Sequence, residues 1–238
     1  MKALILAGGL GTRLRPLTFS IPKPLLPVGE RPLLQIVIEQ LRGFGIDEVV
    51  LATGYQADLI RAFAGDGSRF GVTVDYVHEE QALGTAGPLS LLKGRLDDDE
   101  LLLMMNGDIL TKLDFSRLLA FSRETANDLT TCYTTYTYES PFGVLTVEDE
   151  QITGIVEKPS VEYAISAGIY VLNKRAVELV PDETFYTMPE LMTALISARR
   201  RVGAFRIDEF WIGLETISRF DEAISELDTL SHELAAEQ

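Results

Sequence analysis

The sequence is poor in cysteine and in long apolar runs, which argues against secreted and membrane-spanning proteins. Its 238 residues include a single cysteine, Cys132, so no internal disulfide can form, as expected in a reducing compartment. Nowhere do about 18 apolar residues follow one another, and the run Ala3–Ala7 is too short for a signal peptide. We therefore predict a cytoplasmic protein in which Cys132 is a packed thiol.

Basic residues are scarce as well. Lysine and arginine number 21 against 36 aspartates and glutamates, which gives a formal net charge of −15. Duplex nucleic acid and anionic membranes favour basic surfaces, so we expect neither as a partner. An anionic ligand would instead be attracted by a few placed cations, and Arg13, Arg15 and Lys23 cluster near the N-terminus.

The chain also has little of what nucleophilic or zinc-dependent catalysis requires. Its two histidines, His78 and His232, belong to no Ser/His/Asp or His/Cys cluster, so we expect both to be structural or solvated. Linkers, low-complexity tracts and internal repeats are missing too. We therefore predict one domain spanning residues 1–238.

Strand-like and helix-like segments alternate through the first half of the chain. Apolar β-branched runs predict strands, and apolar residues at helical spacing predict helices. The strands are expected at Lys2–Ala7, Glu48–Thr53, Val72–Val77 and Glu100–Met105, and the helices at Leu33–Phe44, Ala57–Ala64, Gly84–Leu92 and Leu113–Ala126, the last capped by Asp114. This order predicts an α/β fold with a Rossmann-like, mixed but mostly parallel sheet flanked by helices.

After Asn127, strands are expected in quicker succession. They are predicted at Asp128–Tyr138, Gly143–Val147, Ile152–Glu157, Ile165–Leu172 and Val202–Ile207, with helices at Thr187–Ala198 and Thr216–Leu234. We expect this half of the chain to continue the sheet and to close over the first half.

The segment from Met1 to Pro27 has the outline of a phosphate-binding loop. A buried strand leads into Gly8-Gly9-Leu10-Gly11-Thr12-Arg13, where glycines let backbone N–H groups approach an anion. The loop lacks the third glycine of the dinucleotide fingerprint, and GxxxxGK[ST] is absent from the chain. We predict a nucleoside triphosphate site of another type, the alternative being an ordinary glycine turn.

Two further polar segments follow predicted strands, at Glu79–Gly84 and at Asn106–Asp108. Ligands of such sheets bind beyond the carboxyl ends of the strands, so these segments should converge with the glycine loop on one edge. Asp108 is the candidate Mg²⁺ ligand, because Mg²⁺ prefers carboxylate, phosphate and water oxygens. The alternative for Asp108 is a turn or helix-capping aspartate.

Blocks through most of the chain resemble, in the same order, the sugar-1-phosphate nucleotidyltransferases, or NDP-sugar pyrophosphorylases. They are Gly8-Gly9-x-Gly11-Thr12-Arg13-Leu14 with Pro22-Lys23-Pro24, Leu83-Gly84-Thr85-Ala86-Gly87-Pro88-Leu89, Asn106-Gly107-Asp108, Glu157-Lys158-Pro159 and Ala167-Gly168-Ile169-Tyr170. The resemblance implies attack of a sugar 1-phosphate on the α-phosphate of an NTP, with release of pyrophosphate and Mg²⁺ as cofactor. The stretch ALGTAGPLSLL most resembles mannose- and heptose-1-phosphate guanylyltransferases, which favours GTP.

The resemblance also implies residue roles. Arg13, Lys23 and Lys158 would be catalytic, with a nucleotide-binding half at about 1–126 and a sugar-phosphate-binding half at about 127–238. The nucleotide would contact Leu6, Ala7, Gly8, Gly9, Gly11, Thr12, Arg13, Lys23, Glu79, Leu83, Gly84 and Thr85; the sugar phosphate would contact Asn106, Gly143, Glu157, Lys158, Ala167 and Gly168. Both substrates are small molecules, and a homo-oligomer is left open.

The chain departs from the family near its C-terminus. A second metal aspartate usually lies in a stretch resembling W-x-D-x-G, where this chain has Trp211-Ile212-Gly213-Leu214-Glu215. Glu215 or Asp208 could supply the second carboxylate, Asp108 could hold the metal alone, or catalysis could be impaired. The last case would make the chain a weak or regulatory NDP-sugar-binding relative. Thymidylyl, uridylyl or cytidylyl transfer to another sugar or alcohol phosphate is a further alternative.

Overall fold

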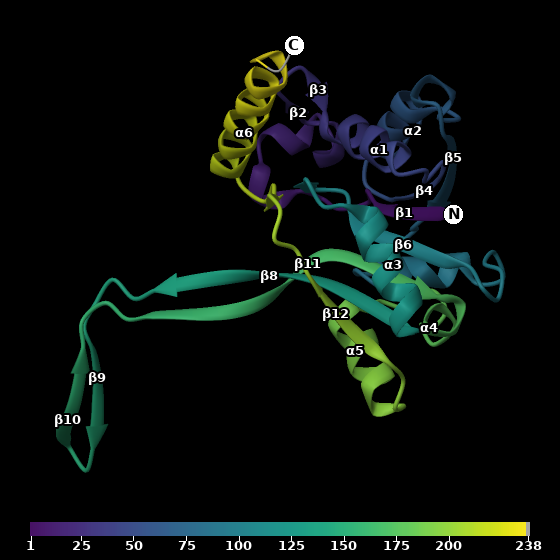
Figure 1. Cartoon of the computed structure of the whole chain (residues 1–238). Coiled ribbons are helices and arrows are strands. Elements are labelled where there is room, and N and C mark those ends of the chain that lie inside the picture. The colour runs from purple at the N-terminus through teal and green to yellow at the C-terminus, as the bar shows by residue number, and fades with distance from the viewer. Residues whose placement is uncertain (237–238) are drawn as a thin grey trace.

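The computed structural model describes the backbone of residues 1–236 and the side chains through residue 226. Its main sheet has seven strands in the order β12-β8-β11-β6-β1-β4-β5 (Figure 1). Their bounds are β1 Lys2–Leu6, β4 Glu48–Thr53, β5 Thr73–His78, β6 Leu101–Asn106, β8 Leu129–Glu139, β11 Ser160–Asn173 and β12 Val202–Arg206. Of these strands, only β11 runs against the others, which confirms the predicted mixed, mostly parallel sheet.

Helices cover both faces of this sheet. One face packs on α1 (Leu33–Gly43), α2 (Ala57–Ala64), α3 (Phe115–Thr125) and α6 (Ile217–Ala236), and the other on η5 (Gly87–Leu92), α4 (Lys174–Glu178) and α5 (Met188–Ser197). Side chains alternate along a strand, so Ala3 and Ile5 of β1 join the first core while Leu4 joins the second. Because a buried core covers each face of the sheet, the strands in the first half of the chain are nearly continuous apolar runs.

The predicted helix Gly84–Leu92 is wrong in its first turn. Residues up to Ala86 form a loop, and only a 3₁₀ helix follows. Gly84 has a left-handed φ of +78°, and the N–H groups of Ala86 and Gly87 both donate to the carbonyl of Tyr186 (2.8 and 3.0 Å). The backbone of this loop is therefore satisfied by a neighbouring loop and not by helical bonds. The predicted cap Asp114 is confirmed, because its carboxylate accepts from the N–H groups of Ser116 and Arg117.

The periodicity of the sequence does not predict several short elements. They are β2 (Pro27–Val28), β3 (Arg31–Pro32), β7 (Ile109–Thr111), β13 (Trp211–Gly213), η1 (Thr12–Leu14), η2 (Leu17–Phe19), η3 (Lys23–Leu25), η4 (Ser68–Phe70) and α4. The pairing of β7 with β13 matters for function, since it brings the C-terminal stretch beside Asp108.

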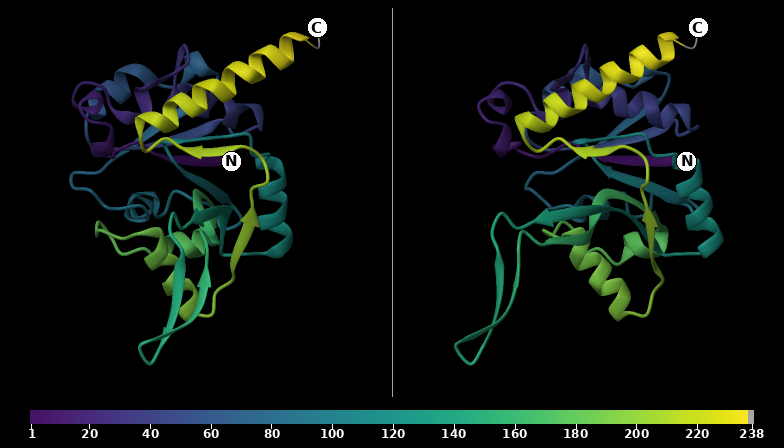
Figure 2. Two further views of the ribbon diagram at one scale, coloured as in Figure 1. Left: turned by 90° about the vertical axis from the view of Figure 1, so that its left-hand side faces the viewer. Right: turned by 60° about the vertical axis from the view of Figure 1, so that its left-hand side comes forward.

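The second half continues the sheet as expected, but part of it, residues 133–166, does not close over the first half. Beyond the body, β8 and β11 continue as a two-stranded ladder, and β9 (Val144–Glu148) and β10 (Gln151–Val156) form a hairpin at its end. We call residues 133–166 the arm; Figures 1 and 2 show it projecting from the sheet. The reason lies in the pairing: β6 bonds β11 only at Ile169–Asn173, and β12 bonds β8 only as far as Tyr133.

The cysteine is buried, and one of the two histidines is exposed to solvent. Cys132 is fully buried, as predicted, and burial raises the pKa of its thiol. His78 is exposed, and the side chain of His232 lies outside the described ones. No helix within residues 1–236 has both the length and the hydrophobicity to cross a bilayer.

Candidate functional site

A cavity of about 430 Å³ opens at the carboxyl ends of β1, β5 and β6, a size typical of small-molecule sites. The loops that follow these strands all contribute to it, as the sheet rule predicts. Its lining consists of Leu6, Ala7, Gly8, Gly9, Gly11, Thr12, Arg13, Leu14, Lys23, Pro24, Glu79, Ala82, Gly84, Thr85, Asn106, Gly107, Asp108, Phe185 and Glu215. The structure therefore brings together every predicted nucleotide residue except Leu83, which lies buried next to the lining.

Hydrogen bonds to neighbouring segments fix the glycine loop. The N–H of Ala7 donates to the carbonyl of Ala52 (2.8 Å), which extends the sheet into the loop. Gly11 has a left-handed φ of +59° at the start of η1, and the hydroxyl of Thr18 donates to its carbonyl (2.8 Å). A side chain at Gly11 would be strained and would also meet Thr18. The loop is thus a fixed turn ahead of Arg13, whose side chain is exposed.

Lys23 starts η3 between two prolines, and its ammonium points into the cavity. Its Nζ lies 2.5 Å from Oδ2 of Asp108, and the two side chains are 14% and 28% exposed. A solvated lysine in a proline turn would be neither so buried nor paired with the candidate metal ligand. The contact places the cation expected at the α-phosphate beside the carboxylate expected at the metal.

Glu79 lies on the opposite wall. Its Oε2 accepts from the N–H of Leu83 (3.0 Å), and burial raises the pKa of its carboxyl against the opposing effect of that bond. Thr85 has a structural task, because its Oγ1 accepts from the N–H of Met188 at the start of α5 (2.8 Å). This wall has the mixed apolar and polar character of a base pocket.

Asn106 lies between the cavity and β11. Its Oδ1 is buried and has no hydrogen-bond partner among the described residues, while its amide packs against Gly168. Ala167 is buried behind it, and its carbonyl accepts from the indole N–H of Trp211 (2.9 Å). Ala167 and Gly168 thus support the cavity wall without lining it. The orphan Asn106 oxygen marks a place where a ligand donor would be accommodated.

Glu215 shares the cavity with Asp108. The N–H of Leu214 donates to the carbonyl of Asp108 (2.8 Å), and a Cβ added to Gly213 would lie 2.5 Å from Oε1 of Glu215. The Glu215 carboxylate therefore occupies the space where a side chain at 213 would begin. Asp208, by contrast, is exposed, pairs with Arg206 (2.9 Å) and does not line the cavity.

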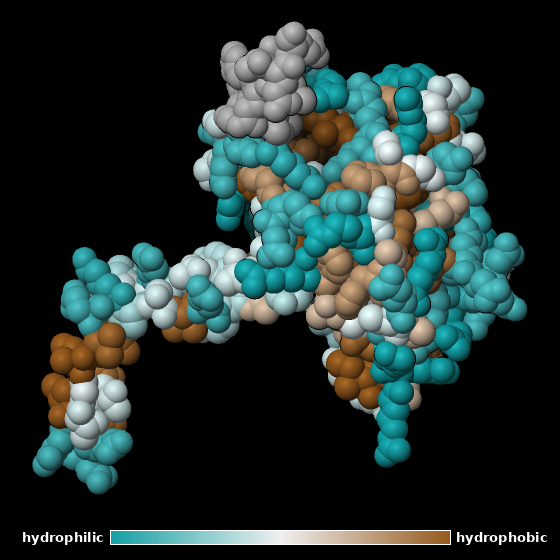
Figure 3. All heavy atoms as spheres, viewed as in Figure 1, coloured by the Kyte–Doolittle hydropathy of each residue, from teal (hydrophilic) through white to brown (hydrophobic). Residues whose placement is uncertain are grey.

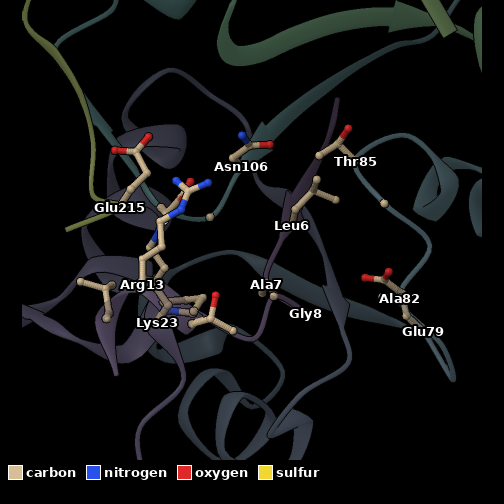
Figure 4. A pocket seen from close by; sticks show the side chains of 18 of the residues that line it. Leu6, Ala7, Gly8, Arg13, Lys23, Glu79, Ala82, Thr85, Asn106 and Glu215 are labelled. Carbon is tan, nitrogen blue, oxygen red and sulfur yellow. The ribbon is translucent and has the colours of Figure 1, made fainter. Parts of the chain in front are cut away.

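Figure 4 shows how the charged groups are distributed. Arg13, Lys23 and Glu215 project from one side of the cavity, and Glu79 with Ala82 lies on the other. The residues around Leu6 to Gly8 separate the two groups. This division suits an elongated ligand with a phosphate end and an uncharged end.

The remaining predicted sugar-phosphate residues lie on the arm. Gly143 packs against Glu157, since a Cβ there would meet Oε2 at 3.0 Å. Lys158 is exposed, with a φ of +44°, between β10 and β11. None of these three residues lines the cavity, so within one chain the predicted site residues lie in two separate places.

Phe185 joins the cavity although no motif marks it. Its loop docks where Tyr186 donates to the carbonyl of Leu83 (2.9 Å). An exposed phenylalanine ahead of a helix cap is a weak signal on its own, so only the fold reveals it.

Comparison with known proteins agrees with this geometry. The family model described as Nucleotidyl transferase matches residues 2–228. The chain belongs to this family. The family model therefore covers both the cavity and the arm.

The chain is also similar to individual proteins and to solved structures. The chain is 36% identical over 221 residues, 90% of its length, to "Probable mannose-1-phosphate guanylyltransferase 1" of Oryza sativa subsp. japonica. It is 37% identical over 185 residues, 76% of its length, to the mannose-1-phosphate guanylyltransferase of Mycobacterium tuberculosis. It spans only 61% and 51% of these two relatives. Among solved structures, HddC from Yersinia pseudotuberculosis superposes with a TM-score of 0.74 at 25% identity, covering 95% of this chain and 99% of that one.

Proposed function

We propose that the chain joins a sugar 1-phosphate to an NTP, with GTP as the favoured nucleotide, to give an NDP-sugar and pyrophosphate. The observation that carries this proposal is the meeting of Arg13, Lys23, Asp108 and Glu215 beside a glycine loop in one cavity. The guanylyltransferase names of the relatives support GTP, as does the HddC structure in complex with GMP-PN. Mannose 1-phosphate is accordingly the first sugar phosphate to test.

In this reaction a phosphate oxygen of the sugar phosphate bonds to the α-phosphorus of the NTP. The bond from that phosphorus to the α,β-bridging oxygen breaks, and pyrophosphate leaves with the electron pair. Such transfers depend on alignment and on neutralising charge. The glycine-loop N–H groups and Arg13 would hold the leaving phosphates, and Lys23 would neutralise the α-phosphate. Lys158 would bind the sugar phosphate.

The cavity fits a Mg²⁺ ion held partly by substrate. Within the described residues, no group of three or more histidine, cysteine or acidic side chains could hold a metal ion. Asp108 and Glu215 nevertheless line the same cavity, as does Asn106, whose buried Oδ1 has no hydrogen-bond partner in the part of the chain that the structure describes. Mg²⁺ commonly takes one or two carboxylates together with phosphate oxygens and water. When bound, it would neutralise phosphate charge.

We assign the second carboxylate to Glu215. Glycine at 213 leaves room for the longer Glu215 side chain, which reaches back over it into the cavity. Asp208 is disfavoured by its exposure and by its ion pair with Arg206. Glu215 would thus supply, from two residues downstream, the metal-binding carboxylate that an aspartate at position 213 supplies in the family pattern.

A pyrophosphate-release assay that crosses the common NTPs with a panel of sugar 1-phosphates tests the proposal. GTP with mannose 1-phosphate or a heptose 1-phosphate should release pyrophosphate in a Mg²⁺-dependent way. Turnover with another nucleotide would replace the GTP assignment. NDP-sugar binding without turnover by any pairing would favour the regulatory alternative and end the catalytic proposal.

A further inference from the structure

The cavity of one chain is short of positive charge for its proposed substrates. Its ionisable lining comprises the cations Arg13 and Lys23 and the carboxyl groups Glu79, Asp108 and Glu215. A triphosphate and a sugar phosphate would bring several more negative charges. Even with a divalent cation, a further basic side chain at the sugar-phosphate end would be expected.

Lys158 is the cation that the family pattern assigns to this end, but its own arm holds it away. The ladder pairs Ser160 with Glu139 and continues residue by residue to Ser166 with Tyr133. At about 3.3 Å per residue, this ladder carries Ser160 about 20 Å beyond Ser166. Lys158 lies two residues before Ser160, at the turn from the β9–β10 hairpin into the far end of the ladder, so reaching its own cavity would require the ladder to bend or break.

The arm exposes an apolar surface that a monomer would not bury. Its large apolar side chains that are 46–74% exposed are Tyr136, Tyr138, Phe142, Val144, Leu145, Val147, Ile152, Ile155, Val156, Val161 and Tyr163. Figure 3 shows brown surface on the projecting arm, among other places on this face. An isolated two-stranded ribbon is at best marginally stable in water, and apolar patches of this kind mark interaction sites.

A second apolar patch follows the glycine loop. Leu10, Leu17, Phe19 and Ile21 are 43–58% exposed, and Phe185 at the cavity is 61% exposed. Phe185 lines the cavity, Leu10 lies in the glycine loop, and Leu17, Phe19 and Ile21 lie between the lining residues Leu14 and Lys23 in the sequence. We call these five side chains the cavity rim. The chain thus carries an apolar arm and an apolar cavity rim, which two copies can match reciprocally.

We propose that the arm of one copy packs on the cavity rim of a second copy and supplies Lys158 to that copy's site. The arrangement is a reciprocal dimer in which each site combines the cavity of one chain with the arm of the other. The inference rests on the proposed function, because that function gives Lys158 its role. The alternative, an arm that bends back to its own cavity, is an outcome of the test.

A subunit-complementation experiment distinguishes delivery of Lys158 by the second copy from an arm that bends back to its own cavity. Lys23→Ala damages the cavity and Lys158→Ala damages the arm, so each variant alone should lose at least about tenfold in rate when the sugar 1-phosphate is well below its KM. Co-expressed in equal amounts, they should regain about a quarter of wild-type activity, since half of the dimers are mixed and each has one intact composite site. The control pairs Lys23→Ala with the Lys23→Ala/Lys158→Ala double variant, which leaves no intact site.

Oligomeric state provides a second measurement that does not depend on activity. Sedimentation should show a wild-type dimer that Ile155→Asp on the arm converts to monomer. Ile196→Asp on α5 is the matched control, because Ile155 and Ile196 are 67% and 62% exposed, and it should leave the dimer intact. A wild-type monomer, or a dimer that Ile155→Asp leaves unchanged, overturns the proposal.

The outcomes distinguish the two proposals. Wild-type turnover without recovery in the mixed dimers would overturn delivery by the second copy and favour an arm that serves its own cavity. Absence of wild-type turnover with every substrate pairing would overturn the proposed function. Sedimentation would then still decide whether the arms hold two copies together.

Discussion

The cavity and the arm carry complementary parts of the proposed site under opposite physical conditions. In the cavity, Lys23 and Asp108 are mostly buried and paired, and the loops around them are anchored to a packed sheet. On the arm, Glu157 and Lys158 are exposed and held by a ladder of two strands. Preorganisation is therefore built into the nucleotide end, while the sugar-phosphate end depends on what the arm contacts.

The largest effect is expected for the cavity cation. Lys23→Ala should lower kcat by about 10²–10³-fold, because it removes a preorganised charge from the α-phosphate. Pyrophosphate release at saturating substrates measures this loss. Lys93→Ala is the matched control: Lys93 also makes a 2.5 Å ion pair, with Asp182, but does not line the cavity. Equal losses in both variants would mean that the cavity is not the site.

A smaller and more selective effect is expected for the arm cation. Lys158→Ala should raise the KM for the sugar 1-phosphate by about tenfold or more and leave the KM for the NTP nearly unchanged, since it contacts one substrate only. Initial rates with each substrate varied in turn measure the two constants. Lys174→Ala, which removes the exposed ion pair with Asp98, is the control. A rise in the KM for the NTP alone would show that the arm does not serve the sugar phosphate.

The third effect concerns the carboxylate that reaches over Gly213. Glu215→Gln should raise the Mg²⁺ concentration for half-maximal rate by about tenfold, because one charged ligand becomes neutral. Gly213→Ala should act in the same direction, since its Cβ would displace Glu215. Titration of the rate with Mg²⁺ measures both, with Asp208→Asn as the control. A Mg²⁺ requirement altered by Asp208→Asn and not by Glu215→Gln would reverse our assignment.

The same contrast explains what the sequence could and could not predict. Strands β1, β4 and β5 follow from apolar runs, and the cavity follows from the rule that their carboxyl ends share an edge. Glu215 reaches the cavity through β7 and β13, three-residue strands about 100 positions apart, which leave no periodicity to detect. The residues of the arm predict its strands except for the first five residues of β11, which begins at Ser160 and not at Ile165. Strand propensity does not say whether a ladder is covered by other elements.

The smallest expected effect concerns the opposite wall of the cavity. Burial raises the pKa of Glu79 above its ordinary value of 4.5, so the folded state binds more protons than the unfolded state between the two values. The free energy of unfolding therefore falls as pH rises through that interval, and the destabilisation is complete above the folded pKa. Glu79→Gln removes this dependence and should stabilise the protein near neutral pH.

The gain should stay below about 1 kcal/mol, because the carboxyl retains solvent contact and a bond from Leu83. Urea unfolding between pH 4 and 8 measures it: the difference between Glu79→Gln and the wild type should shrink as pH falls from the folded pKa towards about 4.5, and it should nearly vanish below 4.5, where both states hold the proton. The exposed neighbour Glu80→Gln is the matched control. A difference that grows towards low pH would show that hydrogen bonding, and not desolvation, dominates at Glu79.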